Sequence, residues 1–160
     1  MKPIMLASDG SPASAAAMRE AIAIAAELHA PLLAVCVEHV AVPSYGYYGY
    51  SEVYLELHKS EREHAEHVLE EVAAAAADAG VDCETVALEG QVVEEICRFA
   101  AERGPAMLVL GAHGWGTLRR LVFGSVSQGV LHEAPCPVLV ARGTDETAAE
   151  ATVERTSATA

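Results

Sequence analysis

Two short segments rich in glycine and serine carry the residues of this chain that are best suited to hold an anion. The first is Gly111-Ala-His113-Gly114, and the second is Gly124-Ser125-Val126-Ser127. Glycine lets backbone N–H groups approach a ligand closely, because no Cβ is in the way. A helix that starts at the second segment would add free N–H groups, the positive end of its dipole and the Ser125 hydroxyl. Two such donor groups facing one crevice suit a polyphosphate.

Other sequence signatures of nucleotide or metal chemistry are missing. There is no Gly-x4-Gly-Lys-Ser/Thr loop, which excludes a P-loop NTPase, and no Gly-x-Gly-x-x-Gly follows the first apolar run. Four cysteines, Cys36, Cys83, Cys97 and Cys136, form no CxxC pair, and no Cys/His set has zinc-finger spacing. We therefore expect reduced thiols in a cytoplasmic protein and no metal site.

The acidic composition of the chain argues against two classes of binding partner, nucleic acids and anionic membranes. The chain has 160 residues, about one domain, with 23 Asp+Glu against 10 Lys+Arg and a net charge of −13. A general nucleic-acid binder needs a basic surface, and so does a protein that docks on anionic membranes. No apolar run reaches the roughly 18–20 residues of a transmembrane helix. We therefore expect no nucleic-acid partner and no membrane partner.

Apolar runs alternate with helical patterns along the chain. The predicted strands are 3–8, 32–38, 81–89, 106–110 and 137–142, and the predicted helices are 12–29, 52–79, 91–103 and one from about Ser125. This alternation predicts an α/β fold, a doubly wound five-stranded parallel sheet with helices on both faces. Ligands of such sheets bind beyond the carboxyl ends of the strands, where the strand order reverses.

Two stretches fall outside this alternation. Residues 39–51 read as an exposed loop, and all five tyrosines lie between positions 45 and 54. This Tyr-rich segment suits a lid over a ligand, a partner contact, or an insertion without a single structure. Residues 143–160 are rich in Thr, Ala and Glu with few large apolar groups, which predicts a disordered acidic tail.

The glycine segments together form a pattern that resembles a known family. Their spacing, Gly111-x2-Gly114-x9-Gly124-Ser125, resembles the ATP-binding signature of the universal stress protein family. The opening Ile4-Met-Leu-Ala-Ser-Asp-Gly-Ser11 resembles the family's first strand and its acidic residue, and Ala134-Pro-Cys-Pro-Val-Leu-Val140 resembles its last strand. The resemblance covers residues 1–142, which we take as one nucleotide-binding domain. It implies strand order 3-2-1-4-5 and a homodimer.

The resemblance also implies a role for individual residues. Those nearest the adenosine would come from the first two strands, and those nearest the phosphates from the glycine segments. The implied cofactor-binding residues are Ala7, Ser8, Asp9, Val37, Leu110, Gly111, His113, Gly114, Gly124, Ser125, Val126 and Ser127. The chain departs from the family at Trp115, where many members carry Arg or Lys, and Arg119 and Arg120 are candidates to compensate.

The function implied by the resemblance is an ATP-binding regulatory or stress-response module, with ATP bound alone or with Mg²⁺. The last strand would pair with a second copy, because Val138, Leu139 and Val140 would otherwise form an exposed, uncharged sheet edge. Two alternatives stay open: a slow ATP-hydrolysing enzyme, and an interaction module with an empty nucleotide site. Phosphoryl transfer needs an oriented water or base, and the sequence offers none near the phosphate segments. We therefore assign no catalytic residue.

Overall fold

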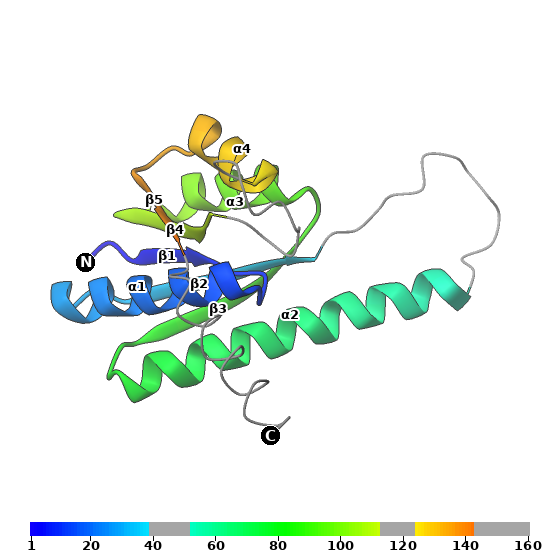
Figure 1. Ribbon diagram of the computed structural model, residues 1–160, viewed down its shortest axis with the longest axis horizontal. Helices are drawn as coiled ribbons and strands as arrows, with labels where there is room; N and C mark the ends of the chain where they lie inside the picture. Colours follow the sequence, from blue (N-terminus) through cyan, green and yellow to red (C-terminus); the bar gives the residue numbers. More distant parts are fainter. Residues whose placement is uncertain (39–51, 113–123, 143–160) are drawn as a thin grey trace, which may run out of the picture.

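The computed structural model describes residues 1–38, 52–112 and 124–142 (Figure 1). Within these ranges the chain alternates strands and helices as predicted, with ends that shift by at most about two residues. The elements are β1 (Ile4–Ala7), α1 (Pro12–Leu28), β2 (Leu32–Glu38), α2 (Glu52–Asp78), β3 (Cys83–Glu89), α3 (Val92–Arg103), β4 (Met107–Gly111), α4 (Ser125–Glu133) and β5 (Val138–Ala141). The Tyr-rich loop at 39–51 and the tail at 143–160 lie outside the described residues.

The strands form one parallel sheet in the order β3-β2-β1-β4-β5, which confirms the predicted order. From the central strand β1 the chain first builds β2 and β3 on one side, and later β4 and β5 on the other. The reversal therefore lies between β1 and β4. Residues on β1 are sealed from solvent on both faces, as Met5 and Leu6 are both 0% exposed.

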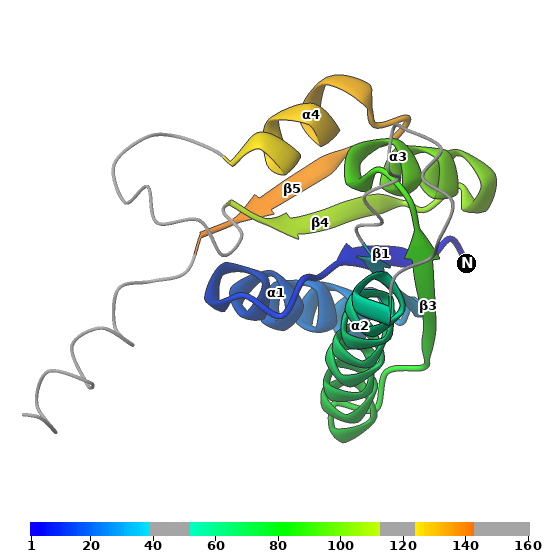
Figure 2. The same ribbon diagram turned by 90° about the vertical axis from the view of Figure 1, so that its right-hand side faces the viewer.

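Helices cover both faces of the sheet, as the alternation predicted. Figures 1 and 2 show α1 and α2 on one face and α3 and α4 on the other. Because successive strand residues point to opposite faces, Leu6 belongs to the core under α1 and α2, while Met5 belongs to the core under α3 and α4. Alanines such as Ala17 and Ala21, both 0% exposed, let α1 pack closely on the sheet. None of the described helices is long and apolar enough to cross a membrane.

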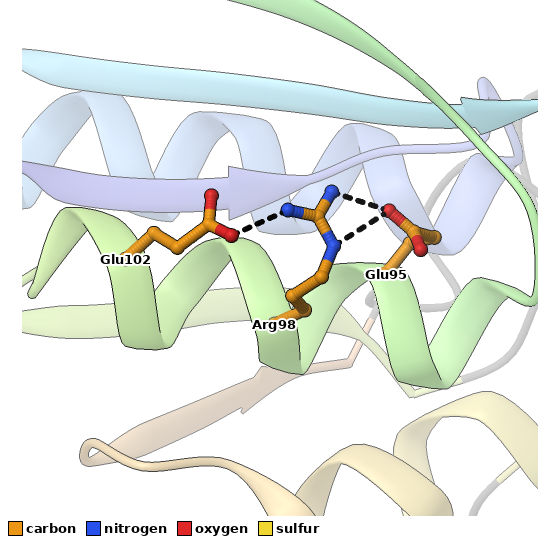
Figure 3. Close-up of polar contacts among 3 residues, drawn as sticks. All are labelled: Glu95, Arg98 and Glu102. Carbon is orange, nitrogen blue, oxygen red and sulfur yellow. Dashed lines mark hydrogen bonds and ion pairs between the residues drawn. The ribbon is translucent and has the colours of Figure 1, made fainter.

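Charged side chains on the exposed surface of α3 form ion pairs. Figure 3 shows Arg98 between Glu95 and Glu102, with a hydrogen bond of 2.6 Å to each carboxylate. At the end of the helix, Arg103 donates a 2.8 Å hydrogen bond to Glu84 of the edge strand β3, which lowers the pKa of that carboxyl. Exposed pairs of this kind add little to stability.

The buried thiol of Cys36 on β2 gives a prediction about alkaline pH. Burial, and then the charges of Asp9, Glu38 and Glu61, raise the pKa of Cys36 to about 11. The unfolded thiol ionises near 9.0, so the stability present below pH 9 is lost as pH rises towards 11. We expect the free energy of unfolding to fall over this window by up to about 2–3 kcal/mol more in the wild type than in Cys36→Ala.

Urea unfolding of both proteins at several pH values between 8 and 11 measures this difference. Tyrosines and lysines also titrate in this range, but they are the same in the two proteins and cancel in the comparison. Parallel curves for wild type and Cys36→Ala would show that the folded thiol ionises as freely as the unfolded one.

Candidate functional site

The carboxyl ends of β1 and β4 meet at the reversal of the sheet, and they bring several predicted residues together. Ala7 on β1 is in register with Leu110 on β4, and the next residues of these two segments are Ser8 and Gly111. Val37 lies on the other side of β1, at the carboxyl end of β2. This edge is where ligands bind in doubly wound sheets.

The first turn of α4 presents main-chain donors without a side-chain cap. Gly124 is the N-cap, in an extended conformation with φ −68° and ψ 164°. The first intrahelical hydrogen bond runs from the Gln128 N–H to the Gly124 oxygen, 3.0 Å away, so the N–H groups of Ser125, Val126 and Ser127 precede the helical ladder. A glycine has no side chain that could accept from them. The positive end of the helix dipole adds to their attraction for an anion.

The first turn of α1 is capped by its own sequence, which sets it apart from α4. The Ser14 N–H donates to the Oγ of Ser11, 3.2 Å away, and the Ser11 side chain is fully buried. Ser11 is therefore the N-cap of α1, a position that serine favours. Of the two helices that begin near the carboxyl ends of β1 and β4, α4 is therefore the one whose first turn has no side-chain cap.

Hydrogen bonds to the carbonyl of Ala112 tie the start of α4 to the end of β4. The Gly124 N–H donates to this oxygen at 2.8 Å, and the Ser127 hydroxyl lies 3.0 Å from it. The same hydroxyl lies 2.9 Å from the Gly124 oxygen, and Ser127 is 2% exposed. The hydroxyl of Ser127 is therefore engaged with main-chain carbonyls, so what this residue can offer a ligand is its N–H.

Gly111 has a packing role that the sequence reasoning missed. A Cβ on this residue would lie 2.7 Å from the Ala13 carbonyl carbon, 2.8 Å from the Ala13 oxygen and 2.9 Å from the Ser14 nitrogen. The end of β4 thus passes directly against the first turn of α1. The glycine pattern had suggested a close approach to a ligand, whereas the close approach seen here is to main chain. Nothing local in the sequence could signal this, because α1 and β4 are far apart along the chain.

The turn between β1 and α1 borders the site and is held by several hydrogen bonds. The Ser11 N–H donates to the Asp9 carboxylate at 3.0 Å, and the Ser8 hydroxyl donates to Ser14 at 3.2 Å. From α2, the Nε2 of His64 lies 3.0 Å from the Asp9 carbonyl oxygen. His64 and Asp9 are 55 positions apart, so this contact depends on how α2 packs and no local pattern in the sequence signals it.

Part of the predicted site lies outside the described residues. His113, Gly114, Trp115, Arg119 and Arg120 all fall in the range 113–123. In the described parts of the chain, no group of three or more His, Cys, Asp or Glu side chains is arranged to hold a metal ion.

Solved structures with the same architecture include nucleotide complexes. A universal stress protein from Archaeoglobus fulgidus was solved in complex with dAMP; it is 20% identical, with a TM-score of 0.63 over 88% of this chain and 98% of that one. An Arabidopsis thaliana member was solved with AMP bound, at 19% identity and a TM-score of 0.69 over 92% and 95% of the two chains. At these identities the likeness shows a common fold.

Sequence comparison gives the family. The model of the universal stress protein family matches residues 1–142. A universal stress protein of Methanocaldococcus jannaschii is 36% identical over 88% of this chain and 82% of its own length. The structure of the universal stress protein UspA from Lactobacillus plantarum is 28% identical, with a TM-score of 0.79 over 88% of this chain and 98% of that one. The chain therefore belongs to the universal stress protein family.

Proposed function

We propose that this protein binds ATP in the crevice between β1 and β4 and acts as a nucleotide-dependent regulatory module. The observation that carries the proposal is the uncapped first turn of α4, fixed to the end of β4 through the Ala112 carbonyl. Family membership supports it, as do the relatives of the same fold that were solved with AMP, dAMP or cAMP.

In this proposal the two ends of the crevice bind different parts of the nucleotide. Ala7, Ser8, Asp9 and Val37 border the adenosine, and the N–H groups of Ser125, Val126 and Ser127 donate to the outer phosphates. His113 and Gly114 take the ribose and the first phosphate. The protein carries a net charge of −13, so the main chain of α4 supplies a local attraction for phosphates that the overall charge does not, and Arg119 and Arg120 are candidates to add to it. Mg²⁺ bound to the phosphates would lower the remaining repulsion.

Calorimetric titration with ATP, ADP, AMP and cyclic AMP tests the proposal directly. We expect ATP to bind most tightly, since its outer phosphates reach the α4 donors, and GTP serves as the control for the base. Mass spectrometry of what co-purifies with the protein is an independent check. The absence of binding to all of these nucleotides would refute the proposal and favour the interaction module with an empty site.

Turnover distinguishes the binding module from a slow ATPase. We expect any hydrolysis of ATP to be far below the ~1–100 s⁻¹ typical of kinases, because no base is assigned near the phosphates and there is no P-loop lysine. Release of inorganic phosphate under saturating ATP and Mg²⁺ measures the rate. A rate within that range, lost on Ser125→Ala, would instead identify an enzyme.

The outer strand β5 is our proposed dimer contact. Within the described sheet it pairs with β4 on one side, and its residues Val138, Leu139 and Val140 are half-buried and uncharged. Pairing with a second copy would satisfy the outward main-chain groups of this edge. We expect light scattering to give the mass of a dimer, and a Val140→Pro variant to shift it towards the monomer, since proline removes a ladder donor. A wild-type monomer at micromolar concentration would contradict this.

A further inference from the structure

We propose that His64 is a positioning residue of the nucleotide site, which acts from α2 by holding the turn between β1 and α1. This inference rests on the proposed function, because that turn contains Ser8 and Asp9, the residues assigned to the adenosine end. His64 itself lies on the long helix that covers β2 and β3, and the early turns of this helix extend beyond the carboxyl ends of the strands (Figure 1).

The contact joins two segments that are far apart in the sequence. The Nε2 of His64 lies 3.0 Å from the carbonyl oxygen of Asp9, and the two residues are separated by 55 positions. The imidazole N–H donates and the carbonyl accepts. A hydrogen bond to main chain restrains the path of the turn itself, so its loss would affect every side chain that the turn carries.

The neighbouring residue Gly10 shows how closely α2 covers the turn. Its φ of +75° is one that L side chains rarely adopt. A Cβ there would lie 2.7 Å from Cγ2 of Val68 and 3.4 Å from Cε1 of His64. Val68 and His64 are one helical turn apart on α2 and share a face. Gly10 therefore lets α2 pack directly on the turn. Val68 lies in the core, and His64 lies at the edge of the core.

Further restraints on the turn come from its own sequence, from α1, and from β2, where the Val35 oxygen accepts from the Ser8 N–H at 3.0 Å. The Asp9 carboxylate accepts from the Ser11 N–H, and Ser11 in turn caps α1. His64 adds a restraint from a different helix, so the turn is held between α1 and α2. A binding loop that is already ordered loses less conformational freedom when the ligand arrives, which raises affinity. Because the His64 side chain is exposed, removing it takes away the restraint and leaves the core in place.

Three variants test this role. We expect His64→Ala to raise the Kd for ATP about fivefold, the effect of one neutral hydrogen bond, and to lower the melting temperature by only about 2–4 °C. His64→Gln keeps an N–H donor on a side chain of similar reach and should restore most of the affinity. His67→Ala is the matched control, since His67 lies on the same helix but pairs with Glu71 at 3.4 Å, and its Kd should equal that of the wild type.

Hydrogen exchange supplies a readout that needs no nucleotide. In the nucleotide-free protein, His64→Ala should speed exchange at the Gly10 and Ser11 amides and leave the β1 amides unchanged. A wild-type Kd in His64→Ala overturns the proposal, and so does an equal loss in His67→Ala. If the wild type binds no nucleotide, the proposed function fails, and unchanged exchange at Gly10 and Ser11 would then show that His64 does not position the turn either.

Discussion

Replacing Gly124 with aspartate should abolish ATP binding and leave the fold as stable as before. Asp is among the best N-cap residues, and the extended backbone of Gly124 is one that any residue adopts. The new carboxylate would accept from the N–H of Val126 or Ser127 and place a negative charge where a phosphate is proposed to bind. Losing two charge-assisted hydrogen bonds, at roughly 1.5–3 kcal/mol each, raises Kd by at least about 100-fold.

Two further substitutions at Gly124 separate the effect of capping the α4 N–H groups on ATP binding from the effect of the added negative charge. Asparagine caps a helix as well as aspartate does but carries no charge, so Gly124→Asn should weaken binding by about tenfold. Alanine neither caps nor carries charge, so Gly124→Ala should bind ATP nearly as the wild type does. Calorimetry gives the affinities, and urea unfolding checks that all three proteins are folded. If Gly124→Asp bound ATP as tightly as the wild type does, the phosphates would have to lie elsewhere.

Gly111→Ala should strongly destabilise the fold, because the added methyl has no room at this position. The new Cβ would lie within 3 Å of three main-chain atoms of Ala13 and Ser14, which cannot rotate away. We expect a loss of about 3 kcal/mol in the free energy of unfolding, the upper end of the range for overpacking. Urea unfolding of the nucleotide-free protein measures it without reference to any ligand.

Gly104→Ala is the matched control for this effect. Gly104 ends α3 with a φ of +56°, and a Cβ there would meet nothing within 4 Å. Its substitution should therefore cost only the strain of the left-handed backbone, about 1–2 kcal/mol. If Gly111→Ala were no more destabilising than Gly104→Ala, the first turn of α1 would have to move away from β4 at little cost.

The fold could be predicted from the sequence because its signals are local. The apolar run 32–38 is β2 from end to end, and the Gly124-Ser125 pair marks the start of α4. Contacts between distant segments were not predictable in this way. Three such contacts depend on how the helices pack on the sheet. They are the packing of Gly111 against Ala13, the hydrogen bond from the Ser127 hydroxyl to the Ala112 oxygen, and the hydrogen bond from the His64 imidazole to the Asp9 oxygen. The roles of His113 and Gly114 stay predictions.

The double use of the Ala112 carbonyl has a consequence for protein engineering. Because Gly124 and Ser127 both bind this oxygen, the start of α4 is located by the end of β4, whatever the length of chain that joins them. Lengthening a connection costs little, about 0.6 kcal/mol for each doubling of its length. A reporter domain with neighbouring termini, inserted after Trp115 so that His113 and Gly114 are kept, would thus leave the α4 donors in place, and nucleotide binding beside it would change its signal.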